Sequence, residues 1–211
     1  MYIGNWLIIA FSIVLTNVPS QLVSQNNNIK ELNMNTKVAT FGSGCFWCSE
    51  AIFNRMEGVI KVEPGFSGGH AKNPSYNEVV QGTTGHAEVA QITYDPDVVS
   101  YSTLLEVFWK THDPTTLNRQ GGDVGTQYRS IIFYHDKDQK KLAEDYLNAL
   151  ESEKIWEDPI VTEIVSFDKF YPAEDYHNDY YKNNPDNSYC SFVITPKIEK
   201  FEKVFADKLK K

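Results

Sequence analysis

The chain has 211 residues, of which 41% are hydrophobic and 23% charged, and its formal net charge at pH 7 is -8. This length and composition are typical of one globular domain, and the acidic balance argues against nucleic acid or an anionic membrane as the main partner. Three cysteines are too few for a disulfide scaffold, so they indicate reactivity, metal binding or packing in a core.

The first segment differs from the rest of the chain. Trp6 to Val18 is almost entirely apolar, and polar residues follow it. The run is too short to span a bilayer and is typical of a signal peptide. We therefore expect residues 1–35 to be a leader and linker, residues 36–211 to form a single domain, and the protein to be exported to a periplasmic or other extracytoplasmic space. Two alternatives remain open: a membrane anchor, or a true start at Met34, which would make the protein cytoplasmic.

The hydrophobic pattern of the other residues predicts interleaved strands and helices. In chain order we expect a strand at 37–42, a helix at 45–57, a strand at 60–65, loops over 65–85, a strand at 86–94, a helix at 101–111, a long loop at 113–126, a strand at 128–134, a helix at 137–152, a strand at 160–166 and helices at 172–183 and 197–210. Because the strands and helices do not strictly alternate, the pattern favours an α+β fold, a two-layer α/β sandwich.

Cys45 begins a predicted helix directly after the flexible sequence G-S-G. The free N–H groups and the dipole at a helix N-terminus stabilise a thiolate and lower the pKa of the thiol. This position therefore predicts a nucleophilic cysteine with Phe46 and Trp47 as an apolar wall beside the sulfur. The alternative is that G-S-G is only a turn and the two aromatic residues are ordinary core.

Glu88 lies on a predicted strand, where it shares one face with His86, Ala90, Ile92 and Tyr94. A carboxyl group among such neighbours is partly buried, and burial raises its pKa because the charged form loses hydration. A glutamic acid that stays protonated near neutral pH can donate a proton. The alternative is an exposed glutamate on a half-solvated strand.

Further polar candidates lie at loop ends. Tyr76 follows a loop, Asp123 lies in a glycine-rich loop, and Tyr128 begins a predicted strand. A phenol can hydrogen-bond a polar oxygen while it packs apolar atoms, although most of the twelve tyrosines must serve the core or the surface. Cys190 stands in a segment rich in Asn, Pro, Asp and Ser, which predicts mobility and would let it swing toward Cys45.

Cys45 and Cys48 also have the spacing of half a zinc site. The second pair of ligands is missing, since Cys190 stands alone and no pair of histidines has the spacing of zinc ligands. A zinc-binding module therefore remains only as an alternative from another class.

Five motifs stand in order along the domain: G-C-F-W-C-x-E, P-S-Y, G-H-A-E-V, G-x-D-V-G-T-Q-Y-R-S and A-E-D-Y-H-x-D-Y-Y. Together, from Val38 to Pro196, they resemble the peptide methionine sulfoxide reductase family, A type. The resemblance implies a ferredoxin-like plait with a mixed sheet, extended loops and a C-terminal tail. It also implies thiol-dependent reduction of methionine-S-sulfoxide, free or in oxidised proteins, to methionine.

The same resemblance implies a role for each candidate residue. Cys45 would be the nucleophile that becomes a sulfenic acid, and Glu88 would protonate the sulfoxide oxygen. The remaining roles are hydrogen bonding to that oxygen by Tyr76 and Tyr128 with Asp123 beside them, and binding of the S-methyl group by Phe46 and Trp47.

The resemblance makes Cys190 the resolving cysteine that would condense with the sulfenic acid, and thioredoxin or another dithiol the external reductant. The motif has Cys48 where relatives often have glycine, and the chain has one C-terminal cysteine where relatives often have two. Resolution by Cys48 and direct reduction therefore stay open. We expect a monomer with no metal or organic cofactor. The alternative function is a thioredoxin-like disulfide oxidoreductase that uses Cys45 and Cys48.

Overall fold

The computed structural model describes residues 35–211 of the chain. The leader predicted for residues 1–35 lies, apart from Asn35, outside the described residues, and so does the prediction of export that depends on it. Within residues 35–211, no helix combines the length and the hydropathy that crossing a membrane requires.

The described residues contain a mixed sheet of six strands in the order β7-β6-β1-β3-β2-β8. These strands are β1 (Lys37–Ser43), β2 (Val59–Ser67), β3 (Ala87–Tyr94), β6 (Ser130–Tyr134), β7 (Glu163–Ser166) and β8 (Phe170–Pro172). Neighbours pair antiparallel except β6 and β7, which are parallel and joined through a helix. A separate small hairpin is formed by β4 (Arg119–Gln120) and β5 (Asp123–Val124).

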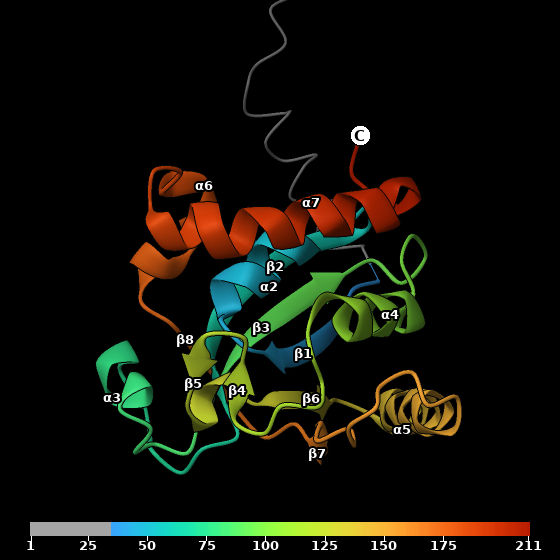
Figure 1. Cartoon of the computed structure of the whole chain (residues 1–211), viewed down its shortest axis with the longest axis horizontal. Helices are drawn as coiled ribbons and strands as arrows, with labels where there is room; N and C mark the ends of the chain where they lie inside the picture. Colours follow the sequence, from blue (N-terminus) through green and yellow to red (C-terminus); the bar gives the residue numbers. More distant parts are fainter. Residues whose placement is uncertain (1–34) are drawn as a thin grey trace, which may run out of the picture. The chain divides into compact units, whose positions relative to one another are not determined.

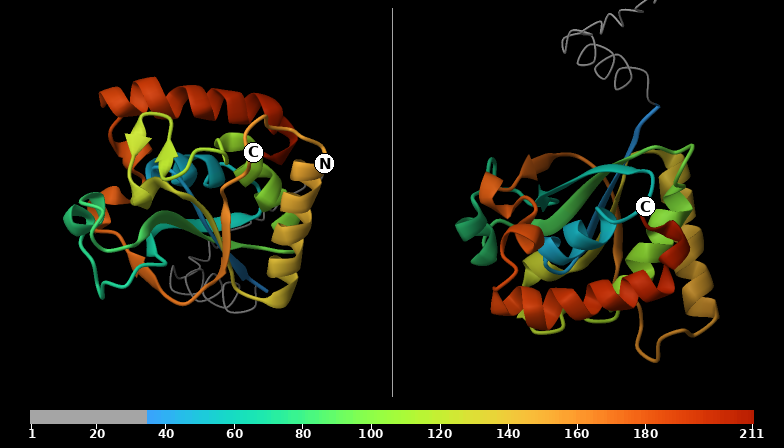
Figure 2. Two further views of the ribbon diagram at one scale, coloured as in Figure 1. Left: turned by 60° about the horizontal axis from the view of Figure 1, so that its bottom comes forward. Right: turned by 90° about the horizontal axis from the view of Figure 1, so that it is seen from above.

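Three helices pack against one face of the sheet and a fourth packs on two of them, as the different directions of view in Figure 1 and Figure 2 show. The three are α2 (Phe46–Phe53), α4 (Tyr101–Thr111) and α5 (Lys137–Ser152), and the fourth, α7 (Thr195–Val204), lies on α2 and α4. Alternate side chains of the strands face them, including Phe41 of β1 and Ile92 of β3, which are fully buried. Burial of one such side chain stabilises the fold by roughly 1.5–3 kcal/mol, so this apolar layer fixes where α2 lies.

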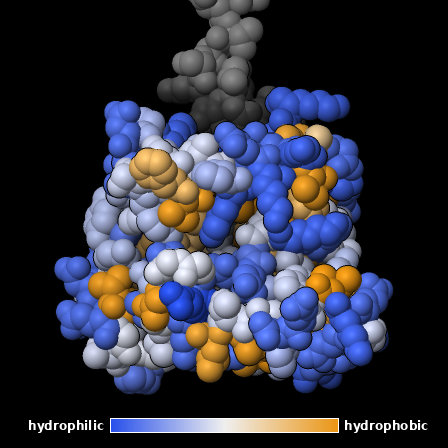
Figure 3. All heavy atoms as spheres, in the orientation of Figure 1, coloured by the Kyte–Doolittle hydropathy of each residue, from blue (hydrophilic) through white to orange (hydrophobic). Residues whose placement is uncertain are grey.

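Irregular chain covers the opposite face of the sheet. Val89, Ile131 and Phe133 form a smaller buried cluster there, and Phe167 and Phe170 pack against it. The protein is therefore a mixed α/β fold in which helices occupy one face of the sheet. The surface drawn in Figure 3 is mostly hydrophilic, with hydrophobic side chains in small groups.

The predicted bounds of α4 and α5 agree with the structure. Residues 172–183, predicted as one helix, differ: β8 ends at Pro172, a 3-10 turn η2 (Asp175–His177) follows, and α6 (Tyr180–Asn183) is short. Asp179 adopts a left-handed conformation with φ 51°, which interrupts a right-handed helix. A further short helix, α3 (Tyr76–Val80), lies within a predicted loop. The 3-10 turn η1 (Thr126–Tyr128) extends from the predicted loop into the strand predicted at 128–134, so Tyr128 ends a turn, and β6 begins only at Ser130.

The C-terminal helix begins earlier than predicted. A π-helical turn η3 (Cys190–Ile194) runs directly into α7, which ends at Val204, and a 3-10 turn η4 (Ala206–Lys208) follows. Cys190 therefore lies on a helix and is 0% exposed, so the prediction of a mobile cysteine is wrong. Ile194 and Ile198 on the same helix are buried as well, and this packing holds the segment in place.

Candidate active site

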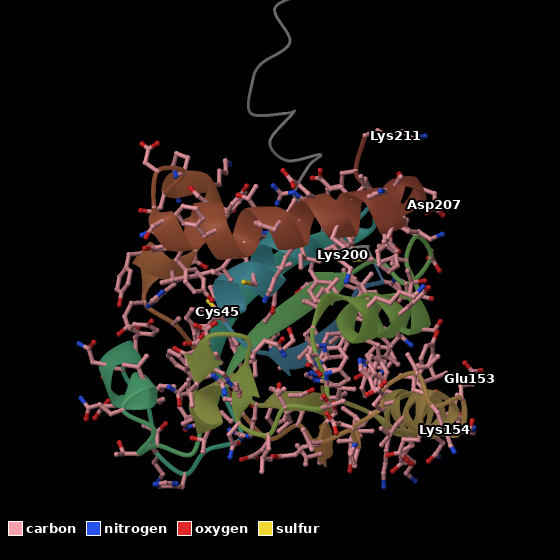
Figure 4. All side chains as sticks on the ribbon, in the orientation of Figure 1. Cys45, Glu153, Lys154, Lys200, Asp207 and Lys211 are labelled. Atoms are coloured by element: carbon pink, nitrogen blue, oxygen red, sulfur yellow. The ribbon has the colours of Figure 1, made fainter. Side chains whose placement is uncertain are left out.

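The turn between β1 and α2 positions Cys45. Gly44 has φ +90°, and a Cβ atom there would lie 2.6 Å from the Cβ of Gln120. A glycine is therefore required both for the turn and for the close approach of the β4–β5 hairpin. Cys45 is the N-cap of α2 and is 5% exposed, and Figure 4 labels it where the helix begins. The cysteine thus occupies the helix start that the sequence predicts.

Glu88 lies beside this helix start. Its Oε2 accepts a hydrogen bond from the backbone N–H of Phe46 at 3.0 Å, and its side chain is buried in the face of β3 that packs on α2. Burial raises the pKa of Glu88 to about 8, although the Phe46 N–H works in the opposite direction. The carboxyl group is therefore mainly protonated at neutral pH. It lies beside Phe46, the residue that follows Cys45.

The predicted low pKa of Cys45 is wrong for the resting protein. Burial raises the pKa of the Cys45 thiol well above its usual value, and a hydrogen bond to Cys48 and the charge of Glu88 act in the same direction. The first N–H of the helix, which would stabilise a thiolate, is donated to Glu88 instead. Cys45 therefore rests as a thiol, because helix position alone does not outweigh burial.

Tyr76, Tyr128 and Asp123 reach the same site from three separate segments. Tyr76 begins α3, Tyr128 ends η1, and Asp123 lies in β5. Burial raises the pKa of both phenols, and the charges of Glu88 and Cys45 raise them further. Both tyrosines therefore remain protonated and can donate hydrogen bonds close to Glu88 and Cys45.

An aromatic group borders Cys45 on the other side. The rings of Phe46 and Tyr76 stack with centroids 6.2 Å apart, and Trp47 stacks on Tyr180 at 3.7 Å with an interplanar angle of 6°. Trp47 Nε1 donates to Nδ1 of the buried His177 at 3.0 Å. Phe46 is 1% exposed, and these rings make the surroundings of Cys45 apolar on this side.

Residues 37–209 match the family described as Peptide methionine sulfoxide reductase. The chain belongs to this family. Similar proteins include the peptide methionine sulfoxide reductase MsrA of Saccharolobus solfataricus, 56% identical over 174 residues that make up 82% of this chain and 97% of that protein. The peptide methionine sulfoxide reductase MsrA of Leptospira borgpetersenii is 54% identical over 165 residues, 78% of this chain and 93% of its own.

Solved structures of methionine sulfoxide reductases have the same mixed α/β fold. The reduced form of Mxr1 from Saccharomyces cerevisiae aligns with a TM-score of 0.67 at 34% identity, over 74% of this chain and 89% of that chain. Methionine sulfoxide reductase A of Corynebacterium diphtheriae aligns with a TM-score of 0.65 at 35% identity, over 72% and 76%. The comparisons do not favour the alternative of a thioredoxin-like disulfide oxidoreductase.

Several residues of this reductase site do not follow from sequence reasoning. The phenol of Tyr189 donates to Asp123 Oδ2 at 2.5 Å and lies within hydrogen-bonding reach of Cys45. Nothing distinguishes Tyr189 from the other eleven tyrosines except its place before Cys190. His177 stands inside the motif A-E-D-Y-H. The motif marks the residue but does not indicate its role.

All three cysteines of the reductase are buried free thiols. Cys48 lies one helical turn after Cys45, and Cys190 lies at the start of η3. In the described part of the chain, no group of three or more His, Cys, Asp or Glu side chains is placed to hold a metal ion, so nothing there supports the zinc alternative.

Proposed function

We propose that this chain reduces methionine-S-sulfoxide, free or within proteins, to methionine, with Cys45 as the nucleophile and Glu88 as the proton donor. One observation carries the proposal: the carboxyl group of Glu88 is bonded at 3.0 Å to the first N–H of the helix that Cys45 caps. The two groups that the reaction needs therefore share one buried site.

The chemistry follows from the protonation states. Sulfoxide sulfur becomes a good electrophile only when its oxygen is protonated, and a neutral Glu88 can supply that proton while Tyr76 and Tyr128 donate hydrogen bonds. Cys45 must lose its own proton before it attacks, because the thiolate is the nucleophile. The oxygen then passes from the substrate sulfur to the Cys45 sulfur, so methionine leaves reduced and Cys45 remains as a sulfenic acid.

The arrangement also supports selectivity for one epimer. The oxygen faces Glu88 and the tyrosines, the S-methyl group faces Phe46 and Trp47, and Cys45 approaches the sulfur itself. Three fixed directions around a pyramidal sulfur exclude its mirror image. The S configuration is proposed because the chain belongs to the reductase family and carries the motifs of its A type.

Recycling requires two electrons from outside the chain. We propose that a second cysteine, Cys190 or Cys48, condenses with the sulfenic acid, and that thioredoxin or a similar dithiol protein reduces the resulting disulfide. Phe192 in η3 is 82% exposed two residues after Cys190, which supports docking of a protein partner at this segment. No metal or organic cofactor takes part in these steps.

We propose that the centre of the sheet is a ferredoxin-like plait. The strand order β6-β1-β3-β2, with all three pairs antiparallel, supports it, because α2 follows β1 and α4 follows β3. Strands β7 and β8 would then be additions at the two edges.

We also propose that residues 1–35 direct export. The apolar run from Trp6 to Val18 supports this proposal. Amino-terminal sequencing of the mature protein tests it: cleavage between the run and the domain is expected, and an intact Met1 would contradict it.

The proposed activity is tested with purified enzyme, a dithiol and each epimer of a methionine sulfoxide peptide. Turnover of the S epimer is expected, with no turnover of the R epimer and no turnover by Cys45→Ser. Turnover by Cys45→Ser would remove the nucleophile from the proposal. Reduction of insulin disulfides without sulfoxide turnover would favour the disulfide oxidoreductase instead.

A further inference from the structure

Lys197 of α7 reaches the sulfur of Cys48. Its Nζ donates to Cys48 Sγ at 3.8 Å, and Cys48 is 3% exposed. The family reaction has no evident need for this contact, since Glu88 and the tyrosines already surround Cys45. An ammonium group placed against a buried thiol favours the thiolate, because the opposite charge replaces lost hydration.

Lys197 and Cys190 extend toward α2 from the same face of one helical run. Residues spaced by three, four or seven positions share a helix face, and the buried side chains Cys190, Ile194 and Ile198 together with Lys197 follow that spacing. The packing brings Cys190 into the same buried cluster as Cys45 and Cys48, and of these two sulfurs it is the charge of Cys48 that acts on Cys190.

Tyr189, the residue before Cys190, is the one that reaches Cys45. Successive helical residues point about 100° apart, so Cys190 does not share the direction of the Tyr189 side chain. That side chain lies beside Cys45, donates to Asp123, and packs edge-on against Trp47 with centroids 6.0 Å apart. The space next to the Cys45 sulfur on this side is therefore occupied by a phenol.

The charged groups around the three sulfurs also favour a thiolate at Cys48 over one at Cys190. A hydrogen bond from Cys45 and the charge of Lys197 lower the pKa of Cys48 to about 7, although burial and Asp123 oppose them. Burial raises the pKa of Cys190, and the negative charge of Cys48 raises it further. The titratable groups that face Cys48 are Cys45, Lys197, Asp123, Tyr189, Cys190 and Glu88.

We propose that Cys48, held as a thiolate by Lys197, is the first resolving cysteine, and that Cys190 is the second. The inference rests on the proposed function, because it begins from a Cys45 sulfenic acid. In the first step the Cys48 thiolate attacks the sulfenic sulfur, the S–O bond breaks, and the hydroxide takes a proton and leaves as water. The Cys45–Cys48 disulfide thereby forms with no outside oxidant.

In the second step Cys190, after losing its proton, attacks the Cys48 sulfur. A Cys48–Cys190 disulfide forms, and Cys45 leaves as a thiolate that takes up that proton. Exchange conserves electrons, so the pair still carries the two oxidising equivalents that an external dithiol must remove. Cys45 is then free for the next substrate while the disulfide lies at the C-terminal helix.

The test is a single turnover of full-length enzyme with excess methionine-S-sulfoxide peptide and no reductant. In Cys190→Ser we expect about one methionine per enzyme, a Cys45–Cys48 disulfide by peptide mapping, and little sulfenic acid trapped by dimedone. In Cys48→Ser we expect the same methionine but a sulfenic acid that persists at least tenfold longer. Methionine release shows in each case that the variant is folded.

Lys197→Met removes the charge and keeps the apolar stem. Because the hydrogen bond from Cys45 also lowers the pKa of Cys48, loss of Lys197 removes only part of the shift. At pH 7 the thiolate fraction of Cys48 is expected to fall by at most about 15-fold, partly offset by an intrinsic reactivity that rises by at most about fivefold, so resolution slows by up to about threefold. The midpoint of the rate against pH moves from about 7 toward the ordinary thiol value of about 8.5. Lys200→Met is the matched control, because Lys200 lies on the same helix and, in Figure 4, well to the side of Cys45.

The outcomes separate the two proposals. No methionine released by the wild-type enzyme would overturn the proposed function. Methionine release with a Cys45–Cys190 disulfide forming at the wild-type rate in Cys48→Ser would overturn only the inference. If the pH midpoint of Lys197→Met equals that of the wild type, Lys197 does not stabilise the Cys48 thiolate.

Discussion

Two regions of the molecule build the site in different ways. The first is the start of α2 together with β3, where regular elements hold Cys45 and Glu88. The second is the segment from residue 173 to residue 197, where short turns and a late helix bring His177, Tyr189 and Lys197 to the first region. The first region carries the two groups that we propose to react, and the second supplies hydrogen bonds and charges around them.

Hydrogen bonds hold the second region in place. Glu50 of α2 accepts from the N–H of Asp179 at 2.8 Å, which joins it to the first region, and Glu174 Oε1 accepts from the backbone N–H of Tyr76 in α3 at 3.0 Å. Its elements have few residues each, so their own propensities cannot fix them. A buried strand and helix keep their geometry when one side chain changes, whereas this segment is expected to respond to single substitutions.

The largest effect is expected from Glu88→Gln in the first region. Loss of the proton donor should slow methionine release roughly 100-fold at pH 7, the size typical of general acid catalysis. Because burial raises the pKa of Glu88 to about 8, the active protonated form is present below pH 8 and is lost as the pH rises through it. The wild-type rate should therefore fall above pH 8, and that fall should be absent from the variant.

Glu63→Gln is the control for this measurement. Glu63 lies on the neighbouring strand β2 and pairs with Lys61 at 2.7 Å, away from the helix start. The rate of methionine release by Glu63→Gln and its pH profile should match those of the wild type. A Glu88→Gln rate within twofold of wild type at pH 7 would speak against the acid role.

The difference between the two regions also explains which features could be predicted from the sequence and which could not. Long periodic patterns gave α4 and α5 with their bounds, and strand alternation placed Glu88 on the face that packs on α2. The pKa of Cys45 was predicted with the wrong sign, because a local pattern does not reveal the burial of the thiol, which is the main cause, nor that Glu88 takes the helix N–H. Lys197 was not predicted, since its contact joins residues 149 positions apart in the sequence.

A smaller effect is expected from His177→Phe in the second region. Burial lowers the pKa of His177, so the imidazole is neutral and its Nδ1 can accept from Trp47. Without the acceptor the indole N–H is left unpaired, at about 1–2 kcal/mol, which corresponds to roughly a tenfold loss in kcat/KM. Most of the loss should be in KM, because the role proposed for Trp47 is to bind the S-methyl group and not to transfer a proton.

Two further variants make this result specific. His177→Gln keeps an acceptor and should recover part of the loss. His135→Phe replaces a half-buried histidine that stacks on Phe167 at 4.2 Å and should leave KM unchanged. Equal KM values for His177→Phe and the wild type would mean that the histidine does not orient Trp47.

The smallest effect on activity is expected from Glu50→Gln, which tests the link between the two regions. Burial raises the pKa of Glu50 to about 7, although the Asp179 N–H lowers it. The folded state therefore binds more protons than the unfolded state between about pH 4.5 and pH 7, and the stability contributed by the protonated group is lost as the pH rises through that window. Glutamine does not titrate, so the fall in unfolding free energy should be shallower by up to about 1.4 kcal/mol per pH unit.

Urea unfolding of both proteins between pH 5 and pH 8 measures this difference. Glu88 also makes the unfolding free energy fall with pH, because its pKa is raised as well. The slope of the variant is therefore compared with the slope of the wild type and not with zero. Glu57→Gln, at an exposed position after α2, should retain the wild-type slope. If Glu50→Gln also retains it, Glu50 is ionised in the folded protein, and the short helix α6 is then held by a charged acceptor instead of a neutral one.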